Sequence, residues 1–177
     1  MKVNQVMIRS VAVCTPQTNL ADAAWTLWER DCGALPVVVG SKIVGMITDR
    51  DIAIAAATKD RPAREIAVQE VIGPIVHACH EEDDVEAALE IMGREQVRRL
   101  PVVDDEDSLT GIVSMNDLIR RTGRERGRAP AQVSSDEVLS ALRGISRHRR
   151  EDEGNGEIPT RRGTEEARPA TRASGRR

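Results

Sequence analysis

Two hydroxyl–carboxylate pairs with the same spacing have the side-chain types needed to contact a small polar ligand. Thr48 precedes Asp51 by three residues, and Ser114 precedes Asp117 by three residues. Each carboxylate offers two acceptor oxygens that match the vicinal hydroxyls of a ribose. Each hydroxyl can hold phosphate together with the N–H groups of a helix N-terminus. The same spacing is also typical of helix capping. Because capping and binding are compatible, we expect both pairs to contact a ligand.

The two pairs belong to a long internal repeat. The copies share their apolar pattern and end in Gly-x-x-Thr/Ser-x-x-Asp. At an offset of 65 residues, VNQVMIRSVAVC (3–14) aligns with VQEVIGPIVHAC (68–79), and GALPVV (33–38) aligns with RRLPVV (98–103). After one inserted residue, GMITDRDI (45–52) aligns with GIVSMNDL (111–118). Such a repeat indicates two copies of one small unit that pack face to face and form paired clefts.

Each copy predicts the same order of elements, β-α-β-β-α, after a short lead-in helix. The lead-in helices are expected near 3–8 and 67–73, the strands at 11–14, 35–39, 42–48, 75–79, 100–104 and 109–114, and the helices from 20, 49, 85 and 116. Asn19 and Asp84 stand where helix N-caps belong. We therefore predict an α/β fold of α+β character in which two tandem repeats are related by an approximate twofold. Val11 and Val13 should then face the same interface as their counterparts Val76 and Ala78.

Composition and charge limit the possible function classes. Apolar residues make up 40% of the 177 residues, and no apolar run reaches the roughly 18 residues of a membrane span. The N-terminus lacks a signal-peptide pattern, so we expect a soluble, cytoplasmic protein. Three Cys without scaffold spacing agree with a reducing compartment. Residues 1–118 carry a net charge of −9 and residues 119–177 one of +6, so the folded body is not a nucleic-acid surface.

Changes in composition predict four regions along the chain. They are the first repeat at 1–60, the second repeat at 61–122, a linker with an amphipathic helix at 123–147, and a disordered charged tail at 148–177. The amphipathic segment covers 134–145 and opens with Ser135 or Asp136 as its cap. The arginine-rich stretch at 120–128 lacks the interleaved aromatic residues that stack on bases, which favours a solvated linker over nucleic-acid binding.

The doubled LPVV, together with GMITDRDI and GIVSMNDL, resembles a pair of CBS domains, the arrangement called a Bateman module. The resemblance covers about residues 1–120, with no enzyme or transporter domain attached, as in the free-standing bacterial CBS-pair proteins. It implies a pseudo-twofold pair of β-α-β-β-α units that usually dimerises into a disc. It also implies binding of AMP, ADP, ATP or sometimes S-adenosylmethionine in the clefts between repeats.

Further candidate ligand contacts follow from this resemblance and from charge. Thr15 and Pro16 lie where the family shapes the adenine pocket, and His80 and Glu81 replace them in the second copy. A guanidinium before the second LPVV could pair with phosphate, although surface arginines of an acidic body are the alternative. The first copy has Gly and Ala at these places, so we expect a one-sided clamp and favour AMP over ATP. The predicted ligand-binding residues are Thr15, Pro16, Thr48, Asp51, Arg98, Arg99, Pro101, Ser114 and Asp117.

No catalytic or metal-binding arrangement is recognisable in the sequence. On a strand, His77 and Cys79 share one face while His80 points to the other, so these side chains do not converge. Trp25 and Trp28 lie one helical turn apart and belong either to the core or to a dimer interface. We predict a non-enzymatic regulatory protein that requires no cofactor, responds to an adenine nucleotide and forms a homodimer through its CBS helices. The regulated partner is unknown. The alternatives are a ligand-free dimerisation module and nucleic-acid binding through the basic C-terminal segment.

Overall fold

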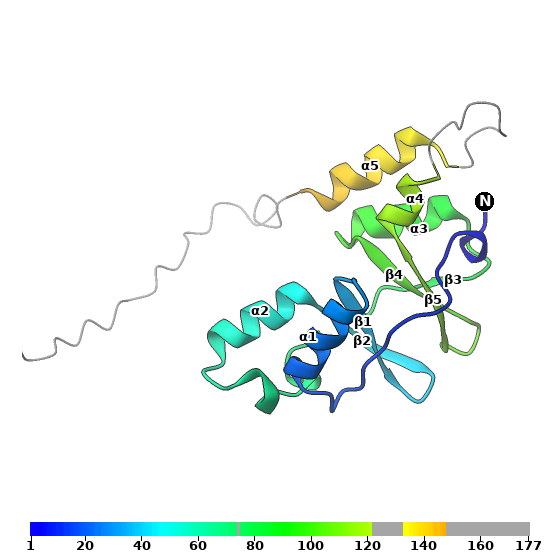
Figure 1. The fold of residues 1–177 in the computed structure, drawn as a ribbon. Helices are drawn as coiled ribbons and strands as arrows, with labels where there is room; N and C mark the ends of the chain where they lie inside the picture. Colours follow the sequence, from blue (N-terminus) through cyan, green and yellow to red (C-terminus); the bar gives the residue numbers. More distant parts are fainter. Residues whose placement is uncertain (74, 122–132, 148–177) are drawn as a thin grey trace, which may run out of the picture. The chain divides into compact units, whose positions relative to one another are not determined.

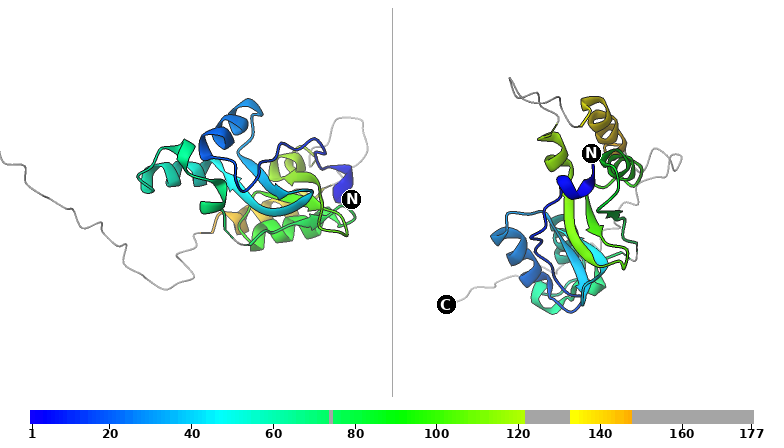
Figure 2. Two further views of the ribbon diagram at one scale, coloured as in Figure 1. Left: turned by 90° about the horizontal axis from the view of Figure 1, so that it is seen from below. Right: turned by 90° about the vertical axis from the view of Figure 1, so that its right-hand side faces the viewer.

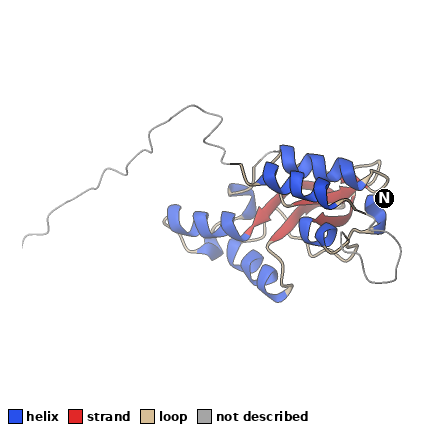
Figure 3. Ribbon diagram, turned by 90° about the horizontal axis from the view of Figure 1, so that it is seen from above, coloured by secondary structure: helices blue, strands red, loops and turns tan. Residues whose placement is uncertain are grey.

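Strands lie between helices in two repeats of the predicted β-α-β-β-α order (Figures 1 and 3). The computed structural model describes residues 1–73, 75–121 and 133–147. The first repeat contains α1 (Leu20–Glu29), β1 (Ala34–Val39), β2 (Lys42–Thr48) and α2 (Asp49–Thr58). The second contains β3 (Cys79–His80), α3 (Val85–Arg94), β4 (Arg99–Val103), β5 (Leu109–Ser114) and α4 (Met115–Ile119). Short 3-10 helices lie at Val3–Gln5, Ala63–Glu65 and Val68–Glu70, and α5 covers Ser135–Ile145. The predicted fold class is confirmed, and the predicted tail at 148–177 lies outside the described residues.

The first strand of each repeat is shorter than predicted. Cys14 forms a single parallel bridge with Val37, and β3 is a two-residue strand parallel to β4. The Cys14 N–H donates to the Pro36 carbonyl oxygen (3.0 Å), and the Val38 N–H donates to the Cys14 carbonyl oxygen (2.9 Å). The next step of this ladder toward the N-terminus would need an N–H from Pro36, which proline lacks. Pro101 has the equivalent place in β4, so the N-terminal residues of both predicted strands fail to pair for the same reason.

Two clusters of buried aliphatic side chains form the core, one around each repeat. In α1 the buried residues are Leu20, Ala23 and Leu27, and in α3 they are Val85, Ala88, Leu89 and Met92. These positions follow the three- and four-residue spacing of an amphipathic helix. Trp25 and Trp28 do not belong to this core, because they are 61% and 72% exposed. The core alternative for these two residues is therefore wrong.

Each lead-in segment completes the core of the other repeat. Ile66 and Val68 are fully buried in the first repeat's cluster, and Val3 is fully buried in the second repeat's cluster. The Leu20 N–H donates to the Ile66 carbonyl oxygen (2.9 Å), and the Val68 N–H donates to the Thr18 carbonyl oxygen (2.8 Å). The same pattern recurs 65 residues away, from Val85 to Met1 (2.8 Å) and from Val3 to Asp83 (2.9 Å). The blue N-terminal segment accordingly lies beside the green second repeat in Figure 2. Each lead-in thus precedes its own repeat in the sequence, as predicted, and packs in the core of the other.

Equivalent hairpin turns of the two repeats meet, as an approximate twofold requires. The Leu109 N–H donates to the Ser41 carbonyl oxygen (2.9 Å), and the hydroxyl oxygens of Ser41 and Ser108 are 3.1 Å apart. Ser108 also forms an antiparallel bridge with Lys42, its counterpart at an offset of 66. The prediction that Val13 faces the interface is wrong, because its side chain is 42% exposed.

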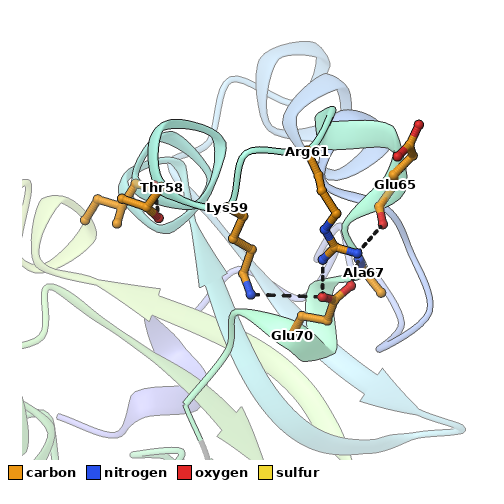
Figure 4. Close-up of polar contacts among 7 residues, drawn as sticks. Thr58, Lys59, Arg61, Glu65, Ala67 and Glu70 are labelled. Carbon is orange, nitrogen blue, oxygen red and sulfur yellow. Dashed lines mark hydrogen bonds and ion pairs between the residues drawn. The ribbon is translucent and has the colours of Figure 1, made fainter. Parts of the chain in front are cut away.

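The connector between the repeats is ordered by a group of charged side chains (Figure 4). The Arg61 guanidinium donates to the Glu70 carboxylate and to the Glu65 carbonyl oxygen (3.4 Å). Glu70 Oε1 accepts the Ala67 N–H (2.9 Å), and Lys59 Nζ lies 4.0 Å from Glu70 Oε2. The Ala67 N–H and then Arg61 hold the pKa of Glu70 below its ordinary value. These contacts hold the connector against the lead-in segment that completes the first repeat.

The predicted amphipathic segment forms α5, with a different cap. The Ser134 hydroxyl accepts the Asp136 N–H (3.3 Å), so Ser134 is the N-cap in place of Ser135 or Asp136. Val138 and Ala141 of α5 are buried in the second repeat's cluster. Among the described residues, no helix is long and apolar enough to cross a bilayer.

The exchange of lead-in segments predicts where a core mutation acts. Val68→Ala removes two buried carbons and should lower the free energy of unfolding by about 1.5–3 kcal/mol. Hydrogen exchange should quicken in α1, whereas Val3→Ala should quicken it in α3. Val13→Ala, at an exposed position, is the control and should cost about 0.5 kcal/mol or less. Faster exchange in α3 after Val68→Ala would contradict the exchange of lead-ins.

The connector predicts a pH-dependent contribution of Glu70 to stability. Because its pKa is lowered on folding, the contribution is present above the ordinary value of 4.5 and is lost as the pH falls through the lowered pKa. Glu70→Gln should therefore lower the Tm at pH 7, and its difference from the wild type should vanish in acid and shrink at high salt. Thermal melts of both proteins against pH measure this. Glu65→Gln is the matched control, and a difference from the wild type that is independent of pH would refute the assignment.

Candidate functional site

Thr48 and Asp51 form a capping box at the junction of β2 and α2. The Thr48 hydroxyl donates to Asp51 Oδ2 (2.6 Å), and the Thr48 N–H donates to the same oxygen (3.0 Å). In return, the Asp51 N–H donates to Thr48 Oγ1 (3.2 Å). These bonds hold the half-buried carboxylate in one orientation. Oδ1 takes part in none of them, so it is the acceptor that the carboxylate can offer to a ligand hydroxyl.

Ser114 and Asp117 repeat this geometry at the junction of β5 and α4. The Ser114 hydroxyl and N–H both donate to Asp117 Oδ2 (2.5 and 3.0 Å), and the Asp117 N–H donates to Ser114 Oγ (3.4 Å). The capping interpretation is thus confirmed for both pairs. Ligand contact stays a prediction for both.

Arg99 extends from the second repeat to the N-terminus of α2 in the first. A Cβ added at Gly33 would lie 3.4 Å from Arg99 Nη2 and 3.3 Å from Asp49 Oδ2. The guanidinium and the carboxylate therefore each lie close to Gly33, where a side chain on that residue would require them to shift by a few tenths of an ångström. Arg98 is exposed, and its carbonyl oxygen accepts the Met115 N–H (2.9 Å). Only one of the two predicted arginines is placed at the junction of the repeats by these contacts.

Charges of both signs surround the start of α2. Asp49 Oδ1 accepts the Arg50 N–H (2.7 Å), which leaves Oδ2 facing the region of Gly33 and Arg99. The N-terminus of a helix carries partial positive charge and favours anions. The negative charge of Asp49 near this position opposes a highly charged anion. Asp49 is not among the ligand-binding residues predicted from the sequence, although its position beside Thr48 in the repeated motif was a usable signal.

The remaining predicted contacts are engaged locally. The Thr15 and Thr18 hydroxyl oxygens lie 3.1 Å apart, and the Thr15 N–H donates to Thr18 Oγ1 (3.0 Å). Pro16 is buried, and its carbonyl oxygen accepts the Gln69 N–H (3.0 Å) from the exchanged lead-in. Pro101 is buried within β4, and its carbonyl oxygen accepts the Cys79 thiol (3.9 Å). A direct ligand contact by these three residues stays a prediction.

The histidines and cysteines near β3 point to different surroundings. His77 Nε2 lies 3.5 Å from Glu95 Oε2, whereas Cys79 is buried and His80 is exposed. Burial, and then the charge of Asp83, raises the pKa of the Cys79 thiol to about 12. Burial likewise raises the pKa of Cys14 to about 11, so both remain protonated thiols at neutral pH. Within residues 1–73, 75–121 and 133–147, no three His, Cys, Asp or Glu side chains come together as metal ligands.

Comparison with protein families matches the CBS domain at residues 3–58 and again at residues 64–123. The CBS domain-containing protein YhcV of Bacillus subtilis (strain 168) is 33% identical over 144 residues. That alignment covers 81% of this chain and 94% of YhcV. The two matched segments correspond to the two repeats of the structure.

Two solved structures are similar in fold and sequence. The CBS domain pair of protein MJ0100, in complex with 5′-methylthioadenosine and S-adenosyl-L-methionine, is 27% identical with a TM-score of 0.64. The match covers 70% of this chain and 100% of that one. Hypoxic Response Protein I, with two coordinated zinc ions, is 28% identical with a TM-score of 0.63, covering 68% and 98%.

Because the two capping boxes stabilise helix N-termini, removing either one should lower the stability of the ligand-free protein. Thr48→Ala and Ser114→Ala should each lower the free energy of unfolding by about 0.5–2 kcal/mol, because each removes an N-cap oxygen. Chemical denaturation measures this. Thr58→Ala, in the last turn of α2, is the control and should cost about 0.5 kcal/mol or less. Equal losses for Thr48→Ala and Thr58→Ala would show that the capping bond contributes nothing specific.

Proposed function

The chain belongs to the CBS domain family, and we propose that it is a non-catalytic regulatory protein that binds an adenosine-containing ligand where its two repeats meet. The observation that carries this proposal is the approach of Arg99, from the second repeat, to Gly33 and Asp49 at the start of α2 in the first. A ligand held between them contacts both repeats. It therefore favours one relative placement of the repeats over another, which is what a regulatory ligand must do.

The acceptor and donor groups at this junction match an adenosine monophosphate. Asp51 Oδ1 is oriented by the capping box and is suited to accept a ribose hydroxyl. The Arg99 guanidinium is suited to a phosphate, while the neighbouring Asp49 and the acidic body oppose a longer polyphosphate. The complex of MJ0100 with two adenosine compounds supports the ligand class. The arginine is the reason for favouring AMP over 5′-methylthioadenosine, which carries no phosphate.

Two occupied clefts are not expected to be equivalent. The second pair, Ser114 and Asp117, has Met115 where the first has Asp49, and Ala34 of the first repeat stands in the place of Arg99. The proposed phosphate-binding site is therefore the one formed by Arg99 near Gly33 and the start of α2. Arg98 is retained as a proposed second contact to the ligand phosphate, with a smaller role because its side chain is exposed.

We also propose self-association through one exposed helical face, called here the α1–α2 face. Its exposed apolar residues are Trp25, Trp28, Ala53, Ile54, Ala56 and Ala57. The centroids of the two indole rings lie 4.9 Å apart on α1, and the exposed side of α2 consists largely of alanines. In a twofold dimer the indoles of one copy can pack on the alanines of the other, and the reverse contact follows by symmetry. An exposed apolar patch of this kind is typical of an interaction site, and a second copy fits it.

The other proposed properties follow from the family and the sequence. We propose a cytoplasmic location, because Cys14, Cys32 and Cys79 are free thiols. The proposed functional unit consists of repeats 1–60 and 61–122, and its regulated partner is another protein. The basic segment proposed as an alternative nucleic-acid contact lies mostly outside the described residues.

Titration calorimetry with AMP and 5′-methylthioadenosine tests the ligand proposal. Asp51→Ala should weaken both ligands about ten- to a hundred-fold, since a charge-assisted hydrogen bond contributes about 1.5–3 kcal/mol. Arg99→Ala should weaken AMP by a similar factor and leave 5′-methylthioadenosine nearly unchanged. Asp117→Ala should have the smaller effect of the two aspartate substitutions.

Arg64→Ala removes an exposed arginine from the connector and is the charge-matched control. In thermal melts, AMP at about 100 times its Kd should stabilise the wild type by roughly 2.7 kcal/mol. If neither adenosine compound binds the folded wild type, the ligand proposal fails and the structural dimerisation module remains. Equal loss of both ligands in Arg99→Ala would refute the phosphate assignment alone.

A further inference from the structure

Helix α5 covers a face of the second repeat whose counterpart on the first repeat is open. α5 packs along α3 and also contacts α4, whereas no equivalent helix of the described residues lies on α1 and α2 (Figure 1). The comparison is direct, because α1 and α3 are ten residues each and align end to end at an offset of 65. The covered surface on the second repeat, called here the α3–α4 face, is thus the equivalent of the α1–α2 face.

The contact between α3 and α5 depends on two glycines. A Cβ added at Gly144 would lie 2.7 Å from the Gly93 carbonyl oxygen and 2.9 Å from its Cα. A Cβ added at Gly93 would lie 3.3 Å from the Ala141 Cα. The two helix backbones are therefore in direct contact. A side chain added at either glycine would meet backbone atoms, which cannot move aside as the end of a flexible side chain can. This close approach lets Val138 and Ala141 reach the core, where they are 5% and 6% exposed.

The first repeat cannot accept α5 in the same way. Trp28 occupies the position equivalent to Gly93, and Trp25 the position equivalent to Glu90. An indole at the crossing point would hold the backbone of an approaching helix several ångströms away. The fit of α5 is therefore specific for the α3–α4 face, and the α1–α2 face needs a partner that accommodates two exposed indoles.

We propose that α5 is an internal cover that confines self-association to the first repeat. This inference rests on the proposed self-association through the α1–α2 face. With α5 docked, each copy presents one apolar helical face and a twofold contact closes at the dimer. With α5 displaced, the apolar residues beneath it become a second face for another copy. The core cluster that Val138 and Ala141 join also contains Leu89, Met92 and Leu118.

The test measures the mass of the full-length protein by light scattering over a range of concentrations. The wild type should be a dimer, and Trp25→Ala with Trp28→Ala should be a monomer. Gly144→Ala should give species larger than a dimer, because its Cβ cannot fit against Gly93. Combining all three substitutions should restore a dimer, now formed through the α3–α4 face.

Controls in α5 separate docking from helix formation. Ser140→Ala lies at an exposed position of the same helix and should leave the mass at the dimer. Faster hydrogen exchange in 135–145 shows that α5 is displaced, and continued protection of α3 shows that the second repeat remains folded. Val138→Asp offers a second route to displacement if Gly144→Ala keeps α5 in place. A synthetic peptide of residues 133–147 should bind the uncovered face and return Gly144→Ala to the dimer.

The outcomes distinguish the two proposals. If the wild type is monomeric and the tryptophan substitutions change nothing, self-association through the first repeat is refuted. A monomer-to-dimer shift on displacing α5 would in that case still support the cover. An unchanged mass after verified displacement of α5, in both Gly144→Ala and Val138→Asp, would overturn the inference.

Discussion

The exchange of lead-in segments is the constraint on which the rest of the structure depends. Val3 is buried among side chains of the second repeat, and Val68 is buried in the first. Each repeat therefore needs the lead-in segment of the other to complete its core. Because the hydrogen bonds that join them recur at an offset of 65, the same exchange also imposes the approximate twofold. The paired hairpin turns and the ligand junction follow from that symmetry.

Within this symmetric frame, differences between equivalent residues decide the chemistry. The twofold brings Arg99 of one repeat close to Gly33 of the other, where glycine leaves room for the guanidinium and for the Asp49 carboxylate. The equivalent place near Met115 has an alanine in the position of that arginine. A fold built from two copies thus places different side chains at its two equivalent positions, and the proposed phosphate site lies at only one of them.

The outer helical faces differ for the same reason. Gly93 allows the α5 backbone to approach α3, whereas Trp28 at the equivalent place excludes such an approach from α1. One face is closed by a segment of the same chain, and the other remains open and apolar. Trp28 and Ala53 of the open face line one pocket together with Gly33 and Asp49, so the proposed association surface adjoins the proposed ligand site.

The sequence by itself determined the repeated unit, its order of elements and the capping residues at the start of α2 and α4, because these depend on spacing within a few residues. The sequence also showed the resemblance to the family, and it predicted Arg99 as a candidate ligand contact. It could not determine which repeat each lead-in segment completes, since both copies offer equivalent acceptors. It could not place Arg99 beside Gly33, or Gly144 on Gly93, because these contacts join residues far apart in the sequence. The first strands are short because Pro36 and Pro101 cannot donate to the ladder. The sequence contains these prolines but does not show which strand lies opposite them. Local spacing sets secondary structure, whereas burial and backbone approach between distant segments are decided only when the chain is packed.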